Sequence, residues 1–115
     1  MRRQRGVDLR NYGTFPRVLA RYVREENVLS LEQAIYKMTA LPASRMRLTS
    51  RGTLAVGMVA DINVFDPETV SDNDDWARPH QYATGFSHVI VAGELVIDNN
   101  TRTNIYPGRI LRREL

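Results

Sequence analysis

The hydrophobic period of the sequence changes near Ser50, and this change constrains the fold more than any other feature. Before Ser50, apolar residues recur every three to four positions, as in a helix that packs on one side. After it, short apolar stretches are separated by Gly, Asn and Asp-Pro, which is typical of strands joined by turns. Helices followed by strands, without βαβ alternation, predict an α+β fold in two parts, residues 1–49 and 50–115.

The first helix is predicted over residues 15–26. Five apolar residues fall on one face of a 3.6-residue repeat: Phe15, Val18, Leu19, Tyr22 and Val23. Charged residues occupy the other face: Arg17, Arg21, Arg24 and Glu25. We expect an ordered turn over residues 11–14, with Thr14 as the N-cap. Pro16 would then lie near the first turn, where its missing N–H costs little.

A second helix is predicted over residues 31–40. Ser30 and Gln33 match a capping box, in which each side chain binds a backbone N–H that the helix leaves unpaired. The apolar face consists of Leu31, Ala34, Ile35 and Met38. Pro42 is favoured at a first helical position and therefore predicts a short helical piece over residues 42–47.

The second half of the sequence predicts short strands. Residues 60–65 carry Ile62, Val64 and Phe65 and are predicted to form a strand, which the breaker Asp66-Pro67 ends. Residues 68–80 are polar, acidic and aperiodic, and we expect a surface loop there.

A β-hairpin follows this loop in the prediction. Its strands cover residues 88–91 and 94–98, and Ala92-Gly93 provides a two-residue turn. A final strand is expected at residues 110–111, after a Pro-Gly pair.

Composition and charge limit the classes of function. The 115 residues include no Cys, which excludes disulfides and thiolate metal sites within this sequence. No apolar stretch approaches the roughly 18–20 residues that span a bilayer, and no apolar region follows the charged start, so we expect neither a membrane segment nor a secretory signal. A cytoplasmic protein is the expectation.

The arginine-rich ends could contact nucleic-acid phosphates, given a net charge of +3. A solvated surface is the favoured interpretation, because no aromatic residues alternate with these arginines and the middle of the chain is acidic.

Side chains that could hold a metal or act as nucleophiles are sparse. His80 and His88 are the only histidines, and neither has a carboxylate at a helpful spacing, whereas zinc sites need three or four ligands. The acidic residues Asp72, Asp74 and Asp75 lack the Gly and Glu of a calcium loop. No serine lies in a Gly-x-Ser-x-Gly turn, and Lys37 is expected on a solvated helix face.

Arg10 is the sharpest candidate from the residues alone. It precedes the predicted turn that leads into the first helix, where its planar guanidinium could bind a carboxylate at two points. A surface ion pair explains the same position equally well.

Three motifs together resemble the D-aminoacylases, the N-acyl-D-amino-acid deacylases of the amidohydrolase superfamily. The first is Arg-Asn-Tyr-Gly-Thr-Phe-Pro-Arg at residues 10–17. The second, residues 52–66, matches a Gly-x-Leu-x-x-Gly-x-x-Ala-Asp-Ile-x-Val-Phe-Asp pattern shared more widely among amidohydrolases. The third is Pro-His-Gln-Tyr at residues 79–82, followed by the hairpin. The His-Pro that precedes the first motif in the family is Asp8-Leu9 here, which is a departure.

The resemblance implies a fold and an activity. Residues 1–49 would be terminal helices of a (β/α)8 barrel, and residues 50–115 part of the small β-sandwich that flanks it. In the family, a zinc ion held by His and Cys on the barrel strands activates water against the acyl amide, and an Asp of the last strand acts as base and then acid.

None of those positions is matched in this sequence, so no catalytic residue and no metal ligand is assigned. Arg10 matches the family arginine that helps bind the substrate carboxylate. The resemblance therefore implies a C-terminal fragment that is inactive and zinc-free on its own. The alternative is a non-catalytic module that forms a homo-oligomer or docks onto a separate N-terminal barrel portion.

Overall fold

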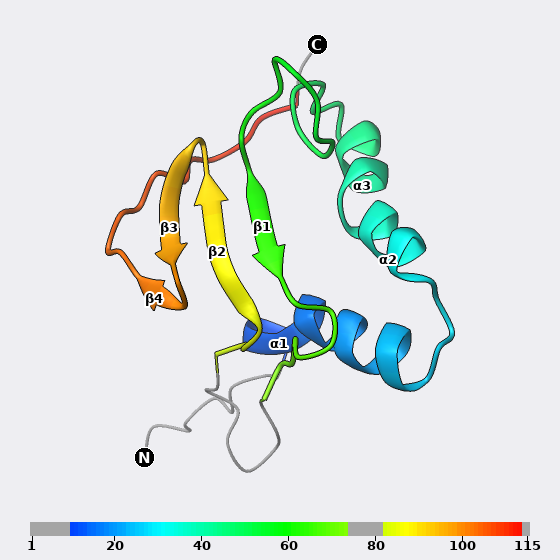
Figure 1. Cartoon of the computed structure of the whole chain (residues 1–115). Helices are drawn as coiled ribbons and strands as arrows, with labels where there is room; N and C mark the ends of the chain where they lie inside the picture. Colours follow the sequence, from blue (N-terminus) through cyan, green and yellow to red (C-terminus); the bar gives the residue numbers. More distant parts are fainter. Residues whose placement is uncertain (1–9, 74–81, 114–115) are drawn as a thin grey trace, which may run out of the picture.

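A computed structural model describes residues 10–73 and 82–113, and in it helices precede strands (Figure 1). The helical segments are α1 (Arg10–Arg17), η1 (Val18–Glu25), α2 (Leu31–Met38) and α3 (Ala40–Arg45). The strands are β1 (Ile62–Phe65), β2 (Phe86–Val91), β3 (Glu94–Asp98) and β4 (Thr101–Arg102). The predicted α+β class is therefore confirmed.

The first helical segment begins earlier than predicted. Residues 11–14 are helical, so the predicted turn and the Thr14 N-cap are wrong, and Pro16 lies inside α1. The first turns of α1 are polar, and apolar periodicity cannot detect them. After Pro16, which removes a backbone donor, the segment η1 has the wider hydrogen-bonding pattern of a π-helix. In the last bond of this pattern, the Glu26 N–H donates to the Arg21 carbonyl at 2.8 Å.

The capping box at α2 is confirmed. The Gln33 N–H donates to Ser30 Oγ at 3.1 Å, and the Ser30 N–H donates to Gln33 Oε1 at 3.0 Å. The helix ends at Met38, two residues earlier than predicted, because Thr39 leaves the helical region with φ −128° and ψ −84°. The next helix, α3, then begins before Pro42, which still lies in its first turn, where no N–H is required.

The four strands form one antiparallel sheet in the order β1-β2-β3-β4. The predicted hairpin is confirmed, although β2 begins at Phe86, two residues earlier than expected. Ala92 and Gly93, which join β2 to β3, have φ values of 50° and 80°. Positive φ at both positions is the geometry of a type I′ turn, whose twist matches that of paired strands.

A second turn of the same kind follows β3. Asn99 and Asn100 have φ values of 49° and 66° and lead directly into β4. The strand predicted at residues 110–111 is wrong, since residues 103–113 form no strand and Ile110 is 90% exposed. The chain leaves the sheet after β4, so this apolar pair has no neighbouring strand to bind.

The core lies where η1, α2 and the segment after β1 meet. Its buried members are Leu19, Ala34 and Val70. Partly buried residues pack around them: Val18, Val23, Leu29, Leu31, Ile35, Met38, Phe65 and Phe86. The predicted surface loop at 68–80 is wrong at Val70, which is 0% exposed, while residues 74–80 lie outside the described part of the chain.

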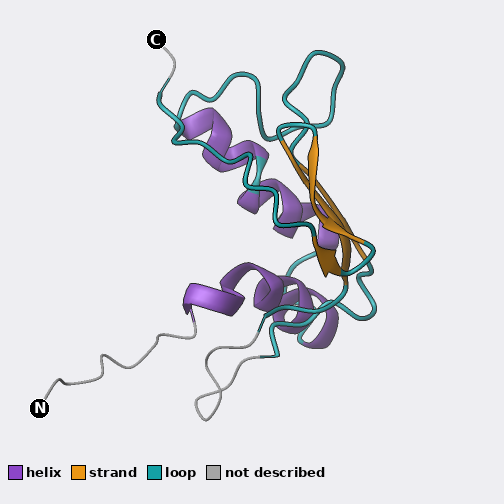
Figure 2. Cartoon of the chain, turned by 90° about the vertical axis from the view of Figure 1, so that its left-hand side faces the viewer, coloured by secondary structure: helices purple, strands orange, loops and turns teal. Residues whose placement is uncertain are grey.

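The molecule is open for its length. Figure 2 shows the strands on one side and the helices on the other. The radius of gyration is 15.7 Å, compared with about 13 Å for a compact domain of this size. Consistent with this, several large apolar side chains are exposed. Within the described residues, no helix is long and apolar enough to cross a membrane.

Candidate functional site

The candidate site begins at Arg10, the first described residue of α1. The sequence predicted a turn directly after Arg10. In the structure Arg10 is instead the first residue of a helix. The structure describes its backbone and not its side chain. The role of Arg10 in substrate binding remains a prediction. The position of its helix, α1, is set by contacts of neighbouring arginines.

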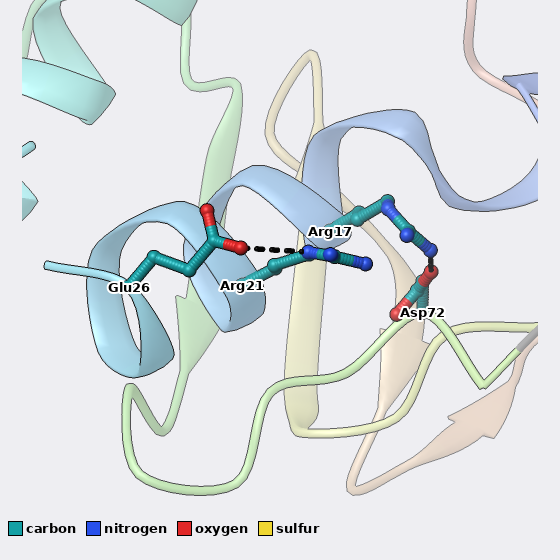
Figure 3. A network of polar contacts seen from close by, with 4 residues as sticks. All are labelled: Arg17, Arg21, Glu26 and Asp72. Atoms are coloured by element: carbon teal, nitrogen blue, oxygen red, sulfur yellow. Dashed lines mark hydrogen bonds and ion pairs between the residues drawn. The ribbon is translucent and has the colours of Figure 1, made fainter. Parts of the chain in front are cut away.

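An ion pair fastens α1 to the segment that follows β1. Arg17 Nη1 lies 3.2 Å from Asp72 Oδ2, and the two residues are 55 positions apart (Figure 3). The Asp72 side chain is 15% exposed and that of Arg17 is 39% exposed. Asp72 had been considered as a calcium ligand in an acidic loop. In the structure its charge is instead paired with an arginine of the helix.

The Arg24 side chain binds backbone carbonyl groups of the same segment after β1. Its Nη1 donates to the Val70 carbonyl at 2.8 Å and to the Pro67 carbonyl at 3.0 Å. From the sequence, Arg17 and Arg24 were expected on the charged face of the helix, opposite the apolar residues, and neither contact was predicted. Their spacing of seven residues, which puts two side chains on the same side of a helix, is the signal that was available.

Arg21 is paired within its own helix. Its Nε donates to Glu26 Oε1 at 3.1 Å, on the exposed side of η1 (Figure 3). This hydrogen bond, together with the Glu26 charge, raises the pKa of Arg21 above its ordinary value. Arg21 thus contacts a residue at the end of its own helix, whereas Arg17 and Arg24 contact the segment after β1.

His88 has a carboxylate partner that its sequence neighbours did not indicate. The antiparallel register of β2 and β3 places Asp98 beside it, with His88 Nε2 and Asp98 Oδ1 3.4 Å apart. His88 Nδ1 lies 2.9 Å from Ser87 Oγ. The His88 and Asp98 side chains are 39% and 56% exposed, so the pair lies at the surface. His80, the other histidine, lies outside the described residues.

The described residues do not fit a zinc site. Over residues 10–73 and 82–113, no group of three or more His, Cys, Asp or Glu side chains could hold a metal ion. His88 and Asp98 supply two donors, whereas zinc sites use three or four.

The sequence of this chain is similar to known proteins of one family. The sequence profile of the amidohydrolase family matches residues 3–97. The N-acyl-D-glutamate deacylase of Alcaligenes xylosoxydans xylosoxydans is 50% identical over 105 residues, which are 91% of this chain and 21% of that protein.

Solved structures agree with the sequence comparison. A crystal structure of D-aminoacylase matches with a TM-score of 0.87 at 40% identity, over 92% of this chain and 22% of the other. An N-acyl-D-glutamate deacylase from Bordetella bronchiseptica, complexed with zinc and a phosphonate mimic of the tetrahedral intermediate, matches with a TM-score of 0.76 at 46% identity, over 77% of this chain and 19% of the other. The chain spans about a fifth of the length of these relatives.

Proposed function

The chain belongs to the amidohydrolase family, and on this premise we propose that it is the C-terminal portion of an N-acyl-D-amino-acid deacylase. The resemblance to D-aminoacylases that the sequence motifs indicated is confirmed by the sequence and structural matches. One observation carries the proposal: 92% of this chain superposes on D-aminoacylase with a TM-score of 0.87 at 40% identity.

The proposal assigns an architecture to each half of the chain. Residues 1–49 would be terminal helices of the catalytic (β/α)8 barrel, and residues 50–115 part of the flanking β-sandwich. The order of the described elements supports this division, because all helices precede residue 50 and all strands follow it.

The proposed reaction of the intact enzyme is hydrolysis of the acyl amide of an N-acyl-D-amino acid. The proposal includes zinc as the metal of the intact enzyme, because the family resemblance implies it. The Bordetella bronchiseptica deacylase, which is complexed with zinc, supports this part of the proposal. The described residues lack a fitting ligand group. We therefore propose that this chain on its own binds no catalytic zinc and hydrolyses nothing.

Arg10 is proposed to bind the carboxylate of the substrate in the intact enzyme. The support is its match to the family arginine and its position on α1. That helix is fastened by Arg17 and, through η1, by Arg24. A guanidinium on a fixed helix binds a carboxylate with less loss of side-chain freedom than one on a loose loop.

Complementation tests the proposal. The Alcaligenes deacylase lacking the segment that matches this chain would be mixed with the whole chain, and hydrolysis of N-acetyl-D-glutamate would be measured with zinc present. We expect turnover in the mixture and none from either part alone. An inactive mixture contradicts the proposal, and so does one tightly bound zinc per chain with turnover by the chain alone.

A non-catalytic docking module is the second candidate. On the predicted apolar face of the first helical segment, Leu19 is 5% exposed, but Phe15 is 64% and Tyr22 40% exposed. The chain thus covers only part of this face, and a second copy or a separate barrel portion would cover the rest. Size-exclusion chromatography with light scattering tests self-association, and a monomer at all concentrations contradicts the homo-oligomer.

A further inference from the structure

A β-bulge brings two neighbouring polar side chains together on β2. Side chains of a regular strand alternate between its two faces, so adjacent side chains do not meet. In the pairing with β1, Phe86 and His88 lie opposite two consecutive residues, which leaves Ser87 between them with no opposite residue. Ser87 Oγ lies 2.9 Å from His88 Nδ1. The bulge therefore interrupts the alternation and re-aims a side chain, as bulges near functional sites do.

The neighbouring strand β3 supplies a carboxylate to the same imidazole. Val89 lies opposite Ile97 in the antiparallel pairing of β2 and β3, so His88 lies beside Asp98 (Figure 1). Asp98 Oδ1 is 3.4 Å from His88 Nε2, the ring nitrogen that faces away from Ser87. A hydroxyl, an imidazole and a carboxylate thus follow one another in a row, and we call these three residues the Ser87 cluster.

Hydrogen-bonding capacity decides which nitrogen of His88 carries the proton. A carboxylate oxygen only accepts, so the pair with Asp98 favours a proton on Nε2. In a neutral imidazole, Nδ1 is then a bare acceptor. The Ser87 hydroxyl has two acceptors within reach, Nδ1 at 2.9 Å and the Val64 carbonyl at 3.4 Å, and Nδ1 is the nearer. A serine that donates to an imidazole whose other nitrogen faces a carboxylate is arranged for loss of its proton.

Ser87 differs in this respect from other serines of the chain. Ser30 and Ser44 use their hydroxyls to bind backbone groups of their own helices. The backbone of Ser87 is held separately, because its carbonyl accepts the Asn100 N–H at 2.9 Å. Ser87 is half-buried and His88 is 39% exposed. A small reagent in solution can therefore reach the hydroxyl while the strand keeps it in place.

We propose that Ser87 is a nucleophile that accepts an acyl group from small activated esters, with His88 as its base and Asp98 as a positioning residue. Ser87 Oγ forms a bond to the carbonyl carbon of the ester, and the bond from that carbon to the leaving oxygen breaks. The Ser87 proton passes to His88 Nδ1. The imidazolium that results pairs with Asp98 and then releases a proton to water. The products are an acylated Ser87, the anion of the leaving group and one proton.

This inference goes beyond the proposed function and does not rest on it. A phenyl ester with an electron-withdrawing substituent expels a stable anion, which needs no proton. An amide must expel an amine, and the amine has to be protonated as it leaves. The Ser87 cluster thus accepts acyl groups from esters and leaves N-acyl-D-amino acids intact. Loss of one proposal would leave the other unaffected.

Acetylation by p-nitrophenyl acetate tests the nucleophile. The whole chain would be incubated with this ester, and the rate of acetylation at each serine would be measured by mass spectrometry of its peptides. We expect Ser87 to be acetylated about 100-fold faster than Ser44. His88→Ala should slow acetylation of Ser87 about tenfold or more. His80→Ala, which replaces the other histidine of the sequence, is the matched control and should leave the rate unchanged.

Nitrogen NMR tests the positioning role of Asp98. In the unchanged chain, the proton of neutral His88 should lie on Nε2. An asparagine can donate to Nε2 and so permits a proton on Nδ1. We therefore expect Asp98→Asn to shift the proton toward Nδ1 and to slow acetylation of Ser87. Melting temperatures of both variants measure whether the fold is kept.

Several results would overturn the inference. They are acetylation of Ser87 no faster than that of Ser44, a rate at Ser87 that His88→Ala leaves unchanged, and a His88 proton on Nδ1 in the unchanged chain. Should His88→Ala unfold the protein, Asp98→Asn and the NMR measurement decide, and an unaltered proton position with an unaltered rate then rejects the proposed roles.

Discussion

Asp61 accepts a hydrogen bond from the backbone N–H of Ala92 at 2.9 Å, across 31 residues of sequence. Ala92 has a φ of 50°, in the left-handed region where a residue with a Cβ is strained by about 1–2 kcal/mol. The other carboxylate oxygen of Asp61 pairs with Arg51. The Asp61 side chain, directly before β1, thus connects Arg51 with the turn of the β2–β3 hairpin.

We expect Asp61→Ala to lower the free energy of unfolding by about 2 kcal/mol, because the Ala92 N–H and the Arg51 guanidinium both lose their acceptor. Arg51 is only 13% exposed, so water replaces the lost partner poorly. Asp61→Asn keeps an acceptor for Ala92 and should cost about half as much. Urea unfolding followed by circular dichroism measures both, and equal losses contradict separate roles for the two oxygens.

Gly85 should tolerate no side chain. Its φ is 91°, and a Cβ would lie 2.5 Å from Val70 Cα and 2.7 Å from Val70 N, both of them backbone atoms that cannot move aside. We expect Gly85→Ala to lower the free energy of unfolding by about 3 kcal/mol. Gly93→Ala is the matched control, with φ 80° and open space around the new Cβ. It should cost only about 1 kcal/mol. Similar thermal unfolding curves for the two variants contradict the close packing at Gly85.

The Arg17–Asp72 pair should contribute modestly to stability. Arg17 is more than a third exposed, and water therefore screens the pair, so Asp72→Ala is expected to cost about 1 kcal/mol. Glu26→Ala, which removes the exposed partner of Arg21, is the control and should change the melting temperature little. The difference between the two variants should shrink in 1 M salt. A difference that does not respond to salt speaks against an ionic contribution.

Ser30→Ala should weaken the start of α2. The substitution removes the acceptor of the Gln33 N–H and disrupts the reciprocal capping box, with an expected cost of about 1 kcal/mol. Ser44→Ala is a suitable control, because Ser44 Oγ donates to the Leu41 carbonyl inside α3 and caps no helix start. Thermal denaturation compares them, and equal destabilisation would argue that the cap is unimportant.

Arg10→Ala should raise the KM of the reconstituted enzyme for N-acetyl-D-glutamate. Loss of hydrogen bonds to a carboxylate predicts an increase of about 10- to 100-fold, with a smaller change in kcat. Arg21→Ala is the control on the adjoining segment η1, since Arg21 pairs with Glu26. Kinetics of both variants separate substrate binding from helix stability. An unchanged KM for Arg10→Ala rules out the proposed contact.

Local patterns were sufficient where neighbouring residues alone decide the conformation. The capping box of Ser30 and Gln33 was predictable because both partners lie within one helical turn. The turn at Ala92 and Gly93 was predictable because the strands on either side are adjacent in sequence. Arg10 could be assigned only through family motifs, since one arginine without its surroundings has no distinguishing pattern.

Contacts between residues far apart in the sequence could not be predicted from local patterns. Asp72 was assigned to an acidic loop, yet it pairs with Arg17. Val70, in the same polar stretch, is fully buried, and its backbone lies against Gly85. His88 meets Asp98 only because β2 and β3 pair in one particular register.

The sequence by itself determined the order of helices and strands, the cap of α2, the hairpin turn and the family, because each depends on short-range periodicity or on a contiguous motif. Only the tertiary structure decided which charges are paired, which glycine lies against backbone, and which apolar residues remain exposed. These properties depend on how segments tens of residues apart approach one another. Leu54 and Val56 are the clearest example. Both are apolar, yet both are exposed, because little of the described chain packs against them.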